Sequence, residues 1–185
     1  MPEPIKTLRT KVRGFWSPRH TFQDSEGNTL GVLAVQRNRW GMCVSAEFRP
    51  EKGEVLYLRR DPGLLRAQFS LWTDNREWLG SSLRWHVGRR QIDVWTGGKP
   101  YRIVPRRGFG LGWRVVATKT GEVAEIRRPL LGRGATVDQY RKMDFELLLF
   151  CYFLGSLTGP ESLLPTSLDA LDEGLGKKAA VPAKG

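Results

Sequence analysis

The chain has 185 residues, of which 40% are hydrophobic and 26% charged, and 30 Lys and Arg against 19 Asp and Glu give a formal net charge of +11. This composition excludes a disordered chain, and the length favours one domain. The two cysteines, Cys43 and Cys151, are too few for a disulfide scaffold or a cysteine-based zinc site. The longest apolar run, Leu147–Leu154, is far shorter than the roughly 20 residues of a membrane-spanning helix, and no signal-peptide pattern is present. We therefore expect a cytoplasmic protein with no transmembrane span.

Residues 20 to 128 form short segments of alternating or β-branched character, separated by turn signals. The segments are His20–Asp24, Thr29–Gln36, Met42–Phe48, Glu54–Leu58, Leu65–Trp72, Leu79–Val87, Gln91–Trp95, Tyr101–Pro105, Trp113–Thr118 and Glu122–Ile126. This spacing is typical of antiparallel strands joined by hairpins. About ten such strands normally close into a barrel or stack as a sandwich. The pattern predicts a mainly β protein.

The pattern changes after Pro129. Thr136-Val-Asp-Gln139 has the form of a capping box, which predicts that a helix begins near residue 137. Gly159-Pro160 predicts that the helix ends near residue 158. Its second half is apolar on every face, and such a helix is stable in water only when other elements surround it. The sequence therefore predicts a closed antiparallel barrel that encloses a hydrophobic C-terminal helix.

Several of these segments resemble the tubby C-terminal-like superfamily, which includes the LURP-one-related proteins and the phospholipid scramblases. Phe22-Gln-Asp-Ser-Glu-Gly-Asn-Thr-Leu-Gly31 is similar to its D-x-x-G-x-x-x-G hairpin. Tyr101-Arg-Ile-Val, then Trp113–Arg127, then a helix over Met143–Leu157 follow the order of elements in the family's second half. The resemblance covers roughly residues 15 to 160. It implies a twelve-stranded barrel around a hydrophobic helix, so we expect about 10–12 strands.

We expect three parts along the chain. Residues 1–14 form an N-terminal arm, residues 15–160 form the tubby-like barrel domain with its central helix at about 137–158, and residues 161–185 form a disordered tail. The tail is rich in Gly, Lys and Pro, a composition that does not bury a core.

The resemblance also implies two different activities. Scramblases use an acidic, calcium-binding segment just before the helix, but here the matching stretch, Gly132–Arg141, has Asp138 as its one carboxylate. Calcium prefers six to eight oxygen ligands, so this departure argues against a calcium site. Tubby-like domains bind phosphoinositide head groups, which requires clustered Lys and Arg.

Arginine doublets follow alternate predicted strands. If the strands form an up-and-down meander, these turns lie at one end of the barrel. The predicted anion-binding residues are Arg37, Arg39, Arg59, Arg60, Arg89, Arg90, Arg106, Arg107, Arg127 and Arg128. With Asp61, these ten Arg carry a net charge of +9, whereas the turns of the opposite end sum to zero. The alternative is that Arg is frequent throughout the chain and turns are simply exposed.

Lysine and arginine near an anionic bilayer favour binding, and Arg also binds phosphate through two hydrogen bonds. We therefore expect a non-enzymatic module that docks on anionic membrane lipid, with phosphoinositide-like head groups, as a peripheral cytoplasmic protein. Scramblase-like lipid translocation, nucleic-acid binding and a scaffold for a protein partner are the alternatives. Nucleic-acid binding would use the same charges with exposed aromatics, whereas we expect Trp72, Trp85, Trp95 and Trp113 to pack in the barrel wall.

Signals for catalysis are weak. His20 and His86 are the two histidines, and neither has a metal-ligand spacing, so we assign both to surface or hairpin positions. Gly108-Phe-Gly-Leu-Gly112 lacks the lysine and helix of a phosphate-binding loop. We expect no catalytic residues, no metal and no cofactor, and we expect Asp144 and Glu146 to mark the exposed end of the helix.

Overall fold

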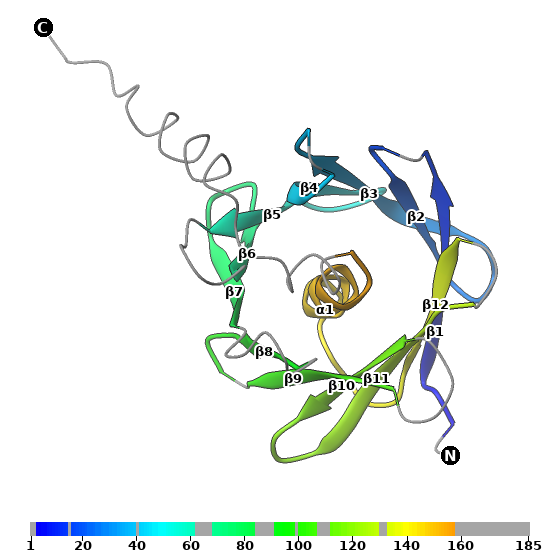
Figure 1. Ribbon diagram of the computed structural model, residues 1–185. Coiled ribbons are helices and arrows are strands. Elements are labelled where there is room, and N and C mark those ends of the chain that lie inside the picture. The colour runs from blue at the N-terminus through cyan, green and yellow to red at the C-terminus, as the bar shows by residue number, and fades with distance from the viewer. Residues whose placement is uncertain are drawn as a thin grey trace, which may run out of the picture.

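A computed structural model of the chain describes residues 3–14, 16–39, 41–61, 68–83, 91–98, 100–106, 112–129 and 133–157. The strands are β1 (Lys6–Arg13), β2 (Arg19–Gln23), β3 (Thr29–Arg37), β4 (Cys43–Pro50), β5 (Leu56–Asp61), β6 (Gln68–Thr73), β7 (Trp78–Leu83), β8 (Ile92–Trp95), β9 (Tyr101–Pro105), β10 (Gly112–Ala117), β11 (Gly121–Arg127) and β12 (Gly134–Gln139), followed by helix α1 (Phe145–Leu157). Each strand pairs antiparallel with its neighbours in sequence, and β1 pairs with β12 to close the barrel (Figure 1). The predicted barrel and its enclosed helix are confirmed.

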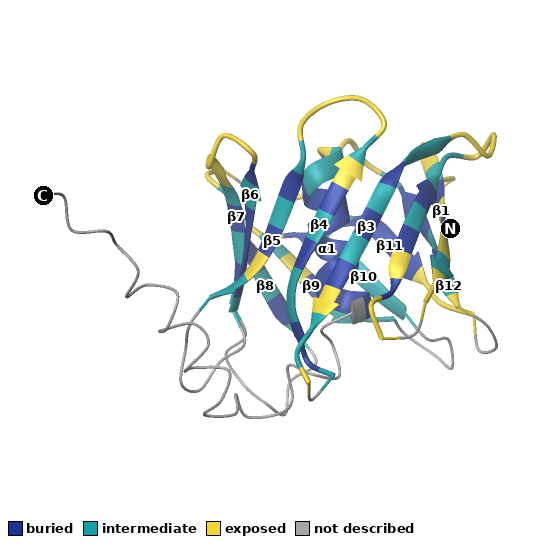
Figure 2. Ribbon diagram, turned by 90° about the horizontal axis from the view of Figure 1, so that it is seen from above, coloured by how far each residue is buried: buried dark blue, intermediate teal, exposed yellow. Residues whose placement is uncertain are grey.

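The strands form because their side chains alternate between the interior and the outer surface. In β3, Leu33 and Val35 are buried while their neighbours are less so, and β5 repeats this with Leu56 and Leu58. A period of two is the burial pattern of a strand with one covered face. The same banding runs along most strands in the side view (Figure 2).

The hairpin between β2 and β3 shows how the turns are fixed locally. One carboxylate oxygen of Asp24 accepts hydrogen bonds from the backbone N–H groups of Glu26 and Asn28, each at 2.9 Å. Gly27 has a φ of 90°, which only glycine adopts at low cost. The segment that resembled a family hairpin in sequence is therefore a hairpin in the structure.

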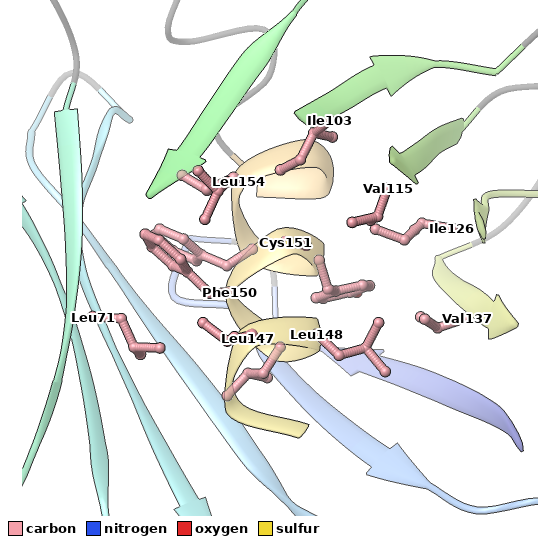
Figure 3. Close-up of a cluster of buried hydrophobic side chains, with 14 of the residues drawn as sticks. Leu71, Ile103, Val115, Ile126, Val137, Leu147, Leu148, Phe150, Cys151 and Leu154 are labelled. Atoms are coloured by element: carbon pink, nitrogen blue, oxygen red, sulfur yellow. The ribbon is translucent and has the colours of Figure 1, made fainter. Parts of the chain in front are cut away.

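Helix α1 is the core of the barrel. Every residue from Leu147 to Leu154 is at most 9% exposed. Strand residues Leu71, Ile103, Val115, Ile126 and Val137 surround the helix residues in the close-up (Figure 3). Each fully buried Leu or Phe contributes about 1.5–3 kcal/mol through the hydrophobic effect. No helix in the described part of the chain is long and apolar enough to cross a membrane.

The structure corrects the predicted start of the helix. Thr136–Gln139 lies in strand β12 and the helix begins at Phe145, so the predicted capping box is wrong. In β12, Ala135 and Val137 face the core, and the strand pairs with both β1 and β11. Asp144 occupies the N-cap position instead, since its carbonyl accepts the first helical hydrogen bond, from the Leu148 N–H at 3.0 Å.

The N-terminal segment also differs from the prediction. Residues 1–14 were expected to form an arm, but Lys6–Arg13 is strand β1, whose Leu8 is buried in the core. β1 pairs with β2 on one side and β12 on the other. Without it the barrel would have two open edges, so this segment is part of the domain.

The meander gives the barrel two different ends. Strands β1, β3, β5, β7, β9 and β11 finish at one end, which we call the basic rim, and the other six finish at the mixed end. Helix α1 begins at the mixed end, where the Lys6 ammonium lies 5.8 Å from the Phe145 ring centre. It finishes at the basic rim, where Arg128 Nη1 donates to the Ser156 carbonyl oxygen at 3.4 Å.

Candidate anion-binding site at the basic rim

Seven of the ten predicted arginines lie in the described part of the chain, and all seven are at the basic rim. They are Arg37, Arg39, Arg59, Arg60, Arg106, Arg127 and Arg128, at or next to the ends of β3, β5, β9 and β11. Arg89, Arg90 and Arg107 lie outside the described residues. The meander assumed in the prediction is thus the observed topology, and it gathers these arginines at one end.

Two of these arginines neutralise carboxylates of the barrel wall. Arg106 Nε lies 2.5 Å from a carboxylate oxygen of Glu125, whose side chain is 8% exposed, and Arg127 forms an ion pair with Asp138, whose side chain is 5% exposed. Tyr140 donates to the second oxygen of Glu125 at 3.2 Å. A buried carboxylate without a partner is strongly destabilising, so Arg106 and Arg127 stabilise the fold and add little net charge to the rim.

Arg59 has a different environment. It lies on the outer face of β5, where its guanidinium is 5.5 Å from the centre of the Tyr57 ring. This cation–π contact orients the side chain without neutralising its charge. Arg59 is exposed and therefore accessible to an anionic surface.

A pocket of about 320 Å³ lies at the basic rim, where β1, β2 and β3 meet the end of α1; we call it the mouth pocket. Among the described residues, its charged lining residues are Arg37, Arg128 and Arg133, with no Asp or Glu. Arg133 was not among the predicted residues. Its guanidinium donates to the carbonyl oxygen of Gly14 at 2.8 Å, which ties the residue before β12 to the β1–β2 turn.

His20 forms one wall of this pocket, and its environment corrects the assignment to a surface position. It points inward from β2 and is 4% exposed. Nδ1 lies 2.8 Å from the Tyr152 hydroxyl, which in turn lies 3.2 Å from Thr10 Oγ1. Burial, then the charges of Arg128 and Arg37, lower the pKa of His20 to about 4. The imidazole is therefore neutral at pH 7.

Two buried polar atoms of the mouth pocket have no hydrogen-bond partner within the described part of the chain: His20 Nε2 and Ser156 Oγ. Buried polar atoms are nearly always paired, so each such atom requires an explanation. Sequence reasoning missed both residues. The available signal was the alternation of His20 with Phe22 in β2, which places the histidine on the buried face.

The mixed end offers a different surface. A pocket of about 580 Å³ there is lined by Tyr101, Lys142, Asp144 and Glu146 among others, so both signs of charge are present. Asp144 is exposed and Glu146 partly so, as expected for this end of the helix. Among the residues that the structure describes, no group of His, Cys, Asp and Glu could hold a metal ion.

The tryptophans divide between the wall and the surface. Trp113 packs against the core, as expected, but Trp95 is 51% exposed on β8 and does not pack in the wall. Trp95 ends its strand at the mixed end, the same end at which β7 begins with the 42% exposed Trp78. Trp16, in the β1–β2 turn at the basic rim, is 53% exposed. Trp85 lies outside the described residues.

Comparison with known proteins gives one structural likeness. No protein-family model matches the sequence, and no curated protein matches it. The fold is similar to the X-ray structure of a protein from Arabidopsis thaliana, AT5G01750, with 16% sequence identity and a TM-score of 0.53. The similarity covers 80% of this chain and 88% of the Arabidopsis chain. At this identity, the two chains share a fold: a closed antiparallel barrel around a C-terminal helix.

Proposed function

We propose that the protein is a non-enzymatic binding module of the tubby C-terminal-like superfamily that docks on anionic membrane lipid with its basic rim. The observation that carries this proposal is the gathering of the seven described arginines at one end of the barrel, of which Arg106 and Arg127 pair with wall carboxylates and the other five would face the lipid. The superfamily assignment is supported by the sequence resemblance and by the fold shared with the Arabidopsis structure. The membrane would be met from its cytoplasmic side, where anionic lipids attract basic surfaces.

The rim also has a residue suited to the bilayer interface. Trp16 is exposed in the β1–β2 turn, on the same end of the barrel as Arg59 and Arg128. Tryptophan is enriched at membrane–water interfaces because its ring is apolar and its N–H is polar. A basic surface with a protruding Trp would combine attraction to phosphate with shallow insertion.

The distribution of exposed aromatics favours membrane over nucleic acid. Single-strand binding uses basic grooves with aromatic side chains on which successive bases stack. The exposed Trp78 and Trp95 lie at the mixed end, away from the arginines of the basic rim, where Trp16 is the one exposed Trp among the described residues. A translocation role would require α1 to leave the barrel, which would expose the apolar surface from Leu147 to Leu154.

Sedimentation with liposomes tests the proposal. The full chain is mixed with vesicles of phosphatidylcholine alone, or with added phosphatidylserine or phosphoinositide, at low and near-physiological salt. The rim variant is Arg39→Glu/Arg59→Glu, which changes neither the Arg106–Glu125 nor the Arg127–Asp138 ion pair. The matched control is Lys52→Glu/Lys119→Glu, which makes the same charge change in exposed turns of the mixed end.

We expect salt-sensitive binding of the wild type to anionic vesicles. Each basic residue near the surface contributes about 1 kcal/mol, so the rim variant should bind at least about 30-fold more weakly, while the control should keep most of its binding. Absence of binding at low salt, or equal loss in both variants, would refute docking by the rim. Quenching of Trp fluorescence by oligonucleotides, lost in the rim variant, would instead indicate nucleic-acid binding.

A further inference from the structure

The mouth pocket has the shape and the polar groups of a specific binding site, which electrostatic docking by a basic surface does not require. It is a concave site of about 320 Å³, at the small end of the range for ligand pockets. Its walls come from elements far apart in the sequence: β2, the end of β3, the residues that flank β12, and α1. Of the residues that the structure describes, three arginines line it and no acidic residue does. A small anion is the ligand class that this charge distribution favours.

The buried histidine supplies a directional group in this pocket. The Tyr152 hydroxyl lies 2.8 Å from His20 Nδ1, and Thr10 Oγ1 lies 3.2 Å from the same hydroxyl. When the tyrosine donates to Nδ1, the neutral imidazole carries its proton on Nε2. Thr10 Oγ1 lies 3.2 Å from the Ala135 carbonyl oxygen as well as 3.2 Å from the tyrosine oxygen, and in this arrangement its one proton is directed to the tyrosine. In this tautomer, His20 presents a buried N–H donor for which the described residues offer no acceptor.

A second donor comes from the end of the helix. Ser156 is 7% exposed, and its hydroxyl is the other polar atom of the pocket that has no partner in the described residues. Its own carbonyl oxygen accepts a hydrogen bond from Arg128. Arg128 therefore offsets the partial negative charge of the helix C-terminus, which would otherwise repel an anion.

We propose that the mouth pocket binds one phosphate group, with His20 Nε2 and Ser156 Oγ as hydrogen-bond donors and Arg37, Arg128 and Arg133 as charge partners. The phosphate is a monoester or free phosphate. Compared with a diester, it carries more negative charge and more unsubstituted oxygen atoms, which suits a site with several donors. This inference deepens the membrane-docking proposal, because a lipid head group can supply such a phosphate. It does not require a membrane, because a soluble phosphate has the same chemistry.

Titration of the full chain with inorganic phosphate and with glycerol 3-phosphate tests the site, with chloride at matched ionic strength as the blank. Binding is followed by calorimetry and by nitrogen-detected NMR of the His20 ring. We expect saturable binding, with the NMR signals showing the proton on Nε2 in the bound state. Equal response to chloride and phosphate, or a ring that stays protonated on Nδ1, would overturn the proposal.

Two variants assign the donors. In His20→Asn, the amide group of Asn replaces Nδ1 as the hydrogen-bond partner of Tyr152, but no atom replaces Nε2. Ser156→Ala removes the Ser156 hydroxyl. Because a hydrogen bond to a charged group is strong, we expect His20→Asn to weaken phosphate binding by about 10- to 100-fold. Ser156→Ala should weaken it by about 10-fold and is a small enough change to fold. Wild-type affinity in the folded variants would refute the assignment.

Vesicles separate the two sources of phosphate and the two proposals. Phosphatidic acid carries a monoester phosphate, whereas phosphatidylglycerol carries only a diester. If lipid fills the pocket, Ser156→Ala weakens binding to phosphatidic acid vesicles and not to phosphatidylglycerol vesicles. If the ligand is soluble, Ser156→Ala weakens phosphate binding and leaves both vesicle types unaffected. Phosphate binding without any vesicle binding would support the pocket and refute membrane docking.

Discussion

The buried His20 makes a quantitative prediction about acid stability. Its pKa is lowered from 6.5 to about 4 in the folded chain, so the folded state holds the ring neutral while the unfolded state protonates it. Between these two values the unfolded state binds more protons, and stability falls as the pH falls. The contribution is fully present above pH 6.5 and is lost progressively down to pH 4. Integrating the two titrations gives a loss of about 2 kcal/mol at pH 5 and about 3 kcal/mol at pH 4.

Urea unfolding, followed by tryptophan fluorescence at intervals from pH 4 to 8, measures this loss. His20→Asn is the matched variant, because it removes the titrating ring and keeps a polar group opposite Tyr152. Carboxylates also titrate in this range, so the informative quantity is the difference in pH dependence between the two proteins. We expect the variant to lack the extra loss of about 2–3 kcal/mol in the free energy of unfolding between pH 6.5 and pH 4. A shift of about 2.5 pKa units at about 1.36 kcal/mol per unit sets the upper limit, and the loss is smaller because the ring is only half protonated at pH 4 in the folded state. Identical pH dependence would show that His20 is not held neutral by burial.

Two further predictions concern helix α1. A Cβ atom at Gly155 would lie 2.9 Å from the Trp113 ring, so Gly155→Ala should lower the free energy of unfolding by about 1–2 kcal/mol despite the better helix propensity of Ala. In a Trp113→Leu background, Gly155→Ala should lose that penalty. Gly97→Ala is the near-neutral control, because a Cβ atom there would have nothing within 4 Å. If denaturant melts show that Gly155→Ala leaves stability unchanged, the packing of Gly155 against Trp113 is contradicted. Burial raises the pKa of the Cys151 thiol to about 12, so an aromatic disulfide reagent at pH 8 should label it only as fast as the chain unfolds. Rapid labelling of the native protein would contradict its position in the core.

The barrel could be predicted because its signals are local. Alternation such as Leu56-Tyr57-Leu58, followed by a turn, identifies a strand without knowledge of its partner. Each of the ten predicted segments overlaps one of the strands β2 to β11. The two strands that were missed, β1 and β12, pair with each other across the whole chain, as in the hydrogen bond from Thr7 to Asp138 at 2.8 Å. A pairing between residues so distant leaves little local trace.

The capping box at Thr136–Gln139 failed for a related reason. Its polar residues do bind backbone groups, since Gln139 Nε2 donates to the Arg141 and Met143 carbonyl oxygens at 2.8 and 3.2 Å. That contact fixes the connection into the helix rather than its first turn. Residue types that cap helices also terminate strands, and only the flanking pairing distinguishes the two.

The basic rim and the mouth pocket differ in what the sequence could predict. The rim follows from counting strands, because alternate turns of a meander share one end. The pocket depends on the depth at which His20, Tyr152 and Ser156 meet, and these lie on β2 and α1. Tyr152 was recognised only as part of an apolar run. Its hydroxyl becomes informative once the helix is placed inside the barrel.

The position of α1 at the end of the described chain constrains how the protein is made. During synthesis all twelve strands leave the ribosome before the residues from 145 to 157 that fill their interior. Until then, no helix covers the inward faces of the sheet. The edge of β1 also stays unpaired until β12 has been synthesised. Such long-range closure is slow, and exposed apolar strands are prone to aggregate. The emerging chain thus depends on α1 to become a stable barrel, and we expect it to need chaperones until α1 has been synthesised.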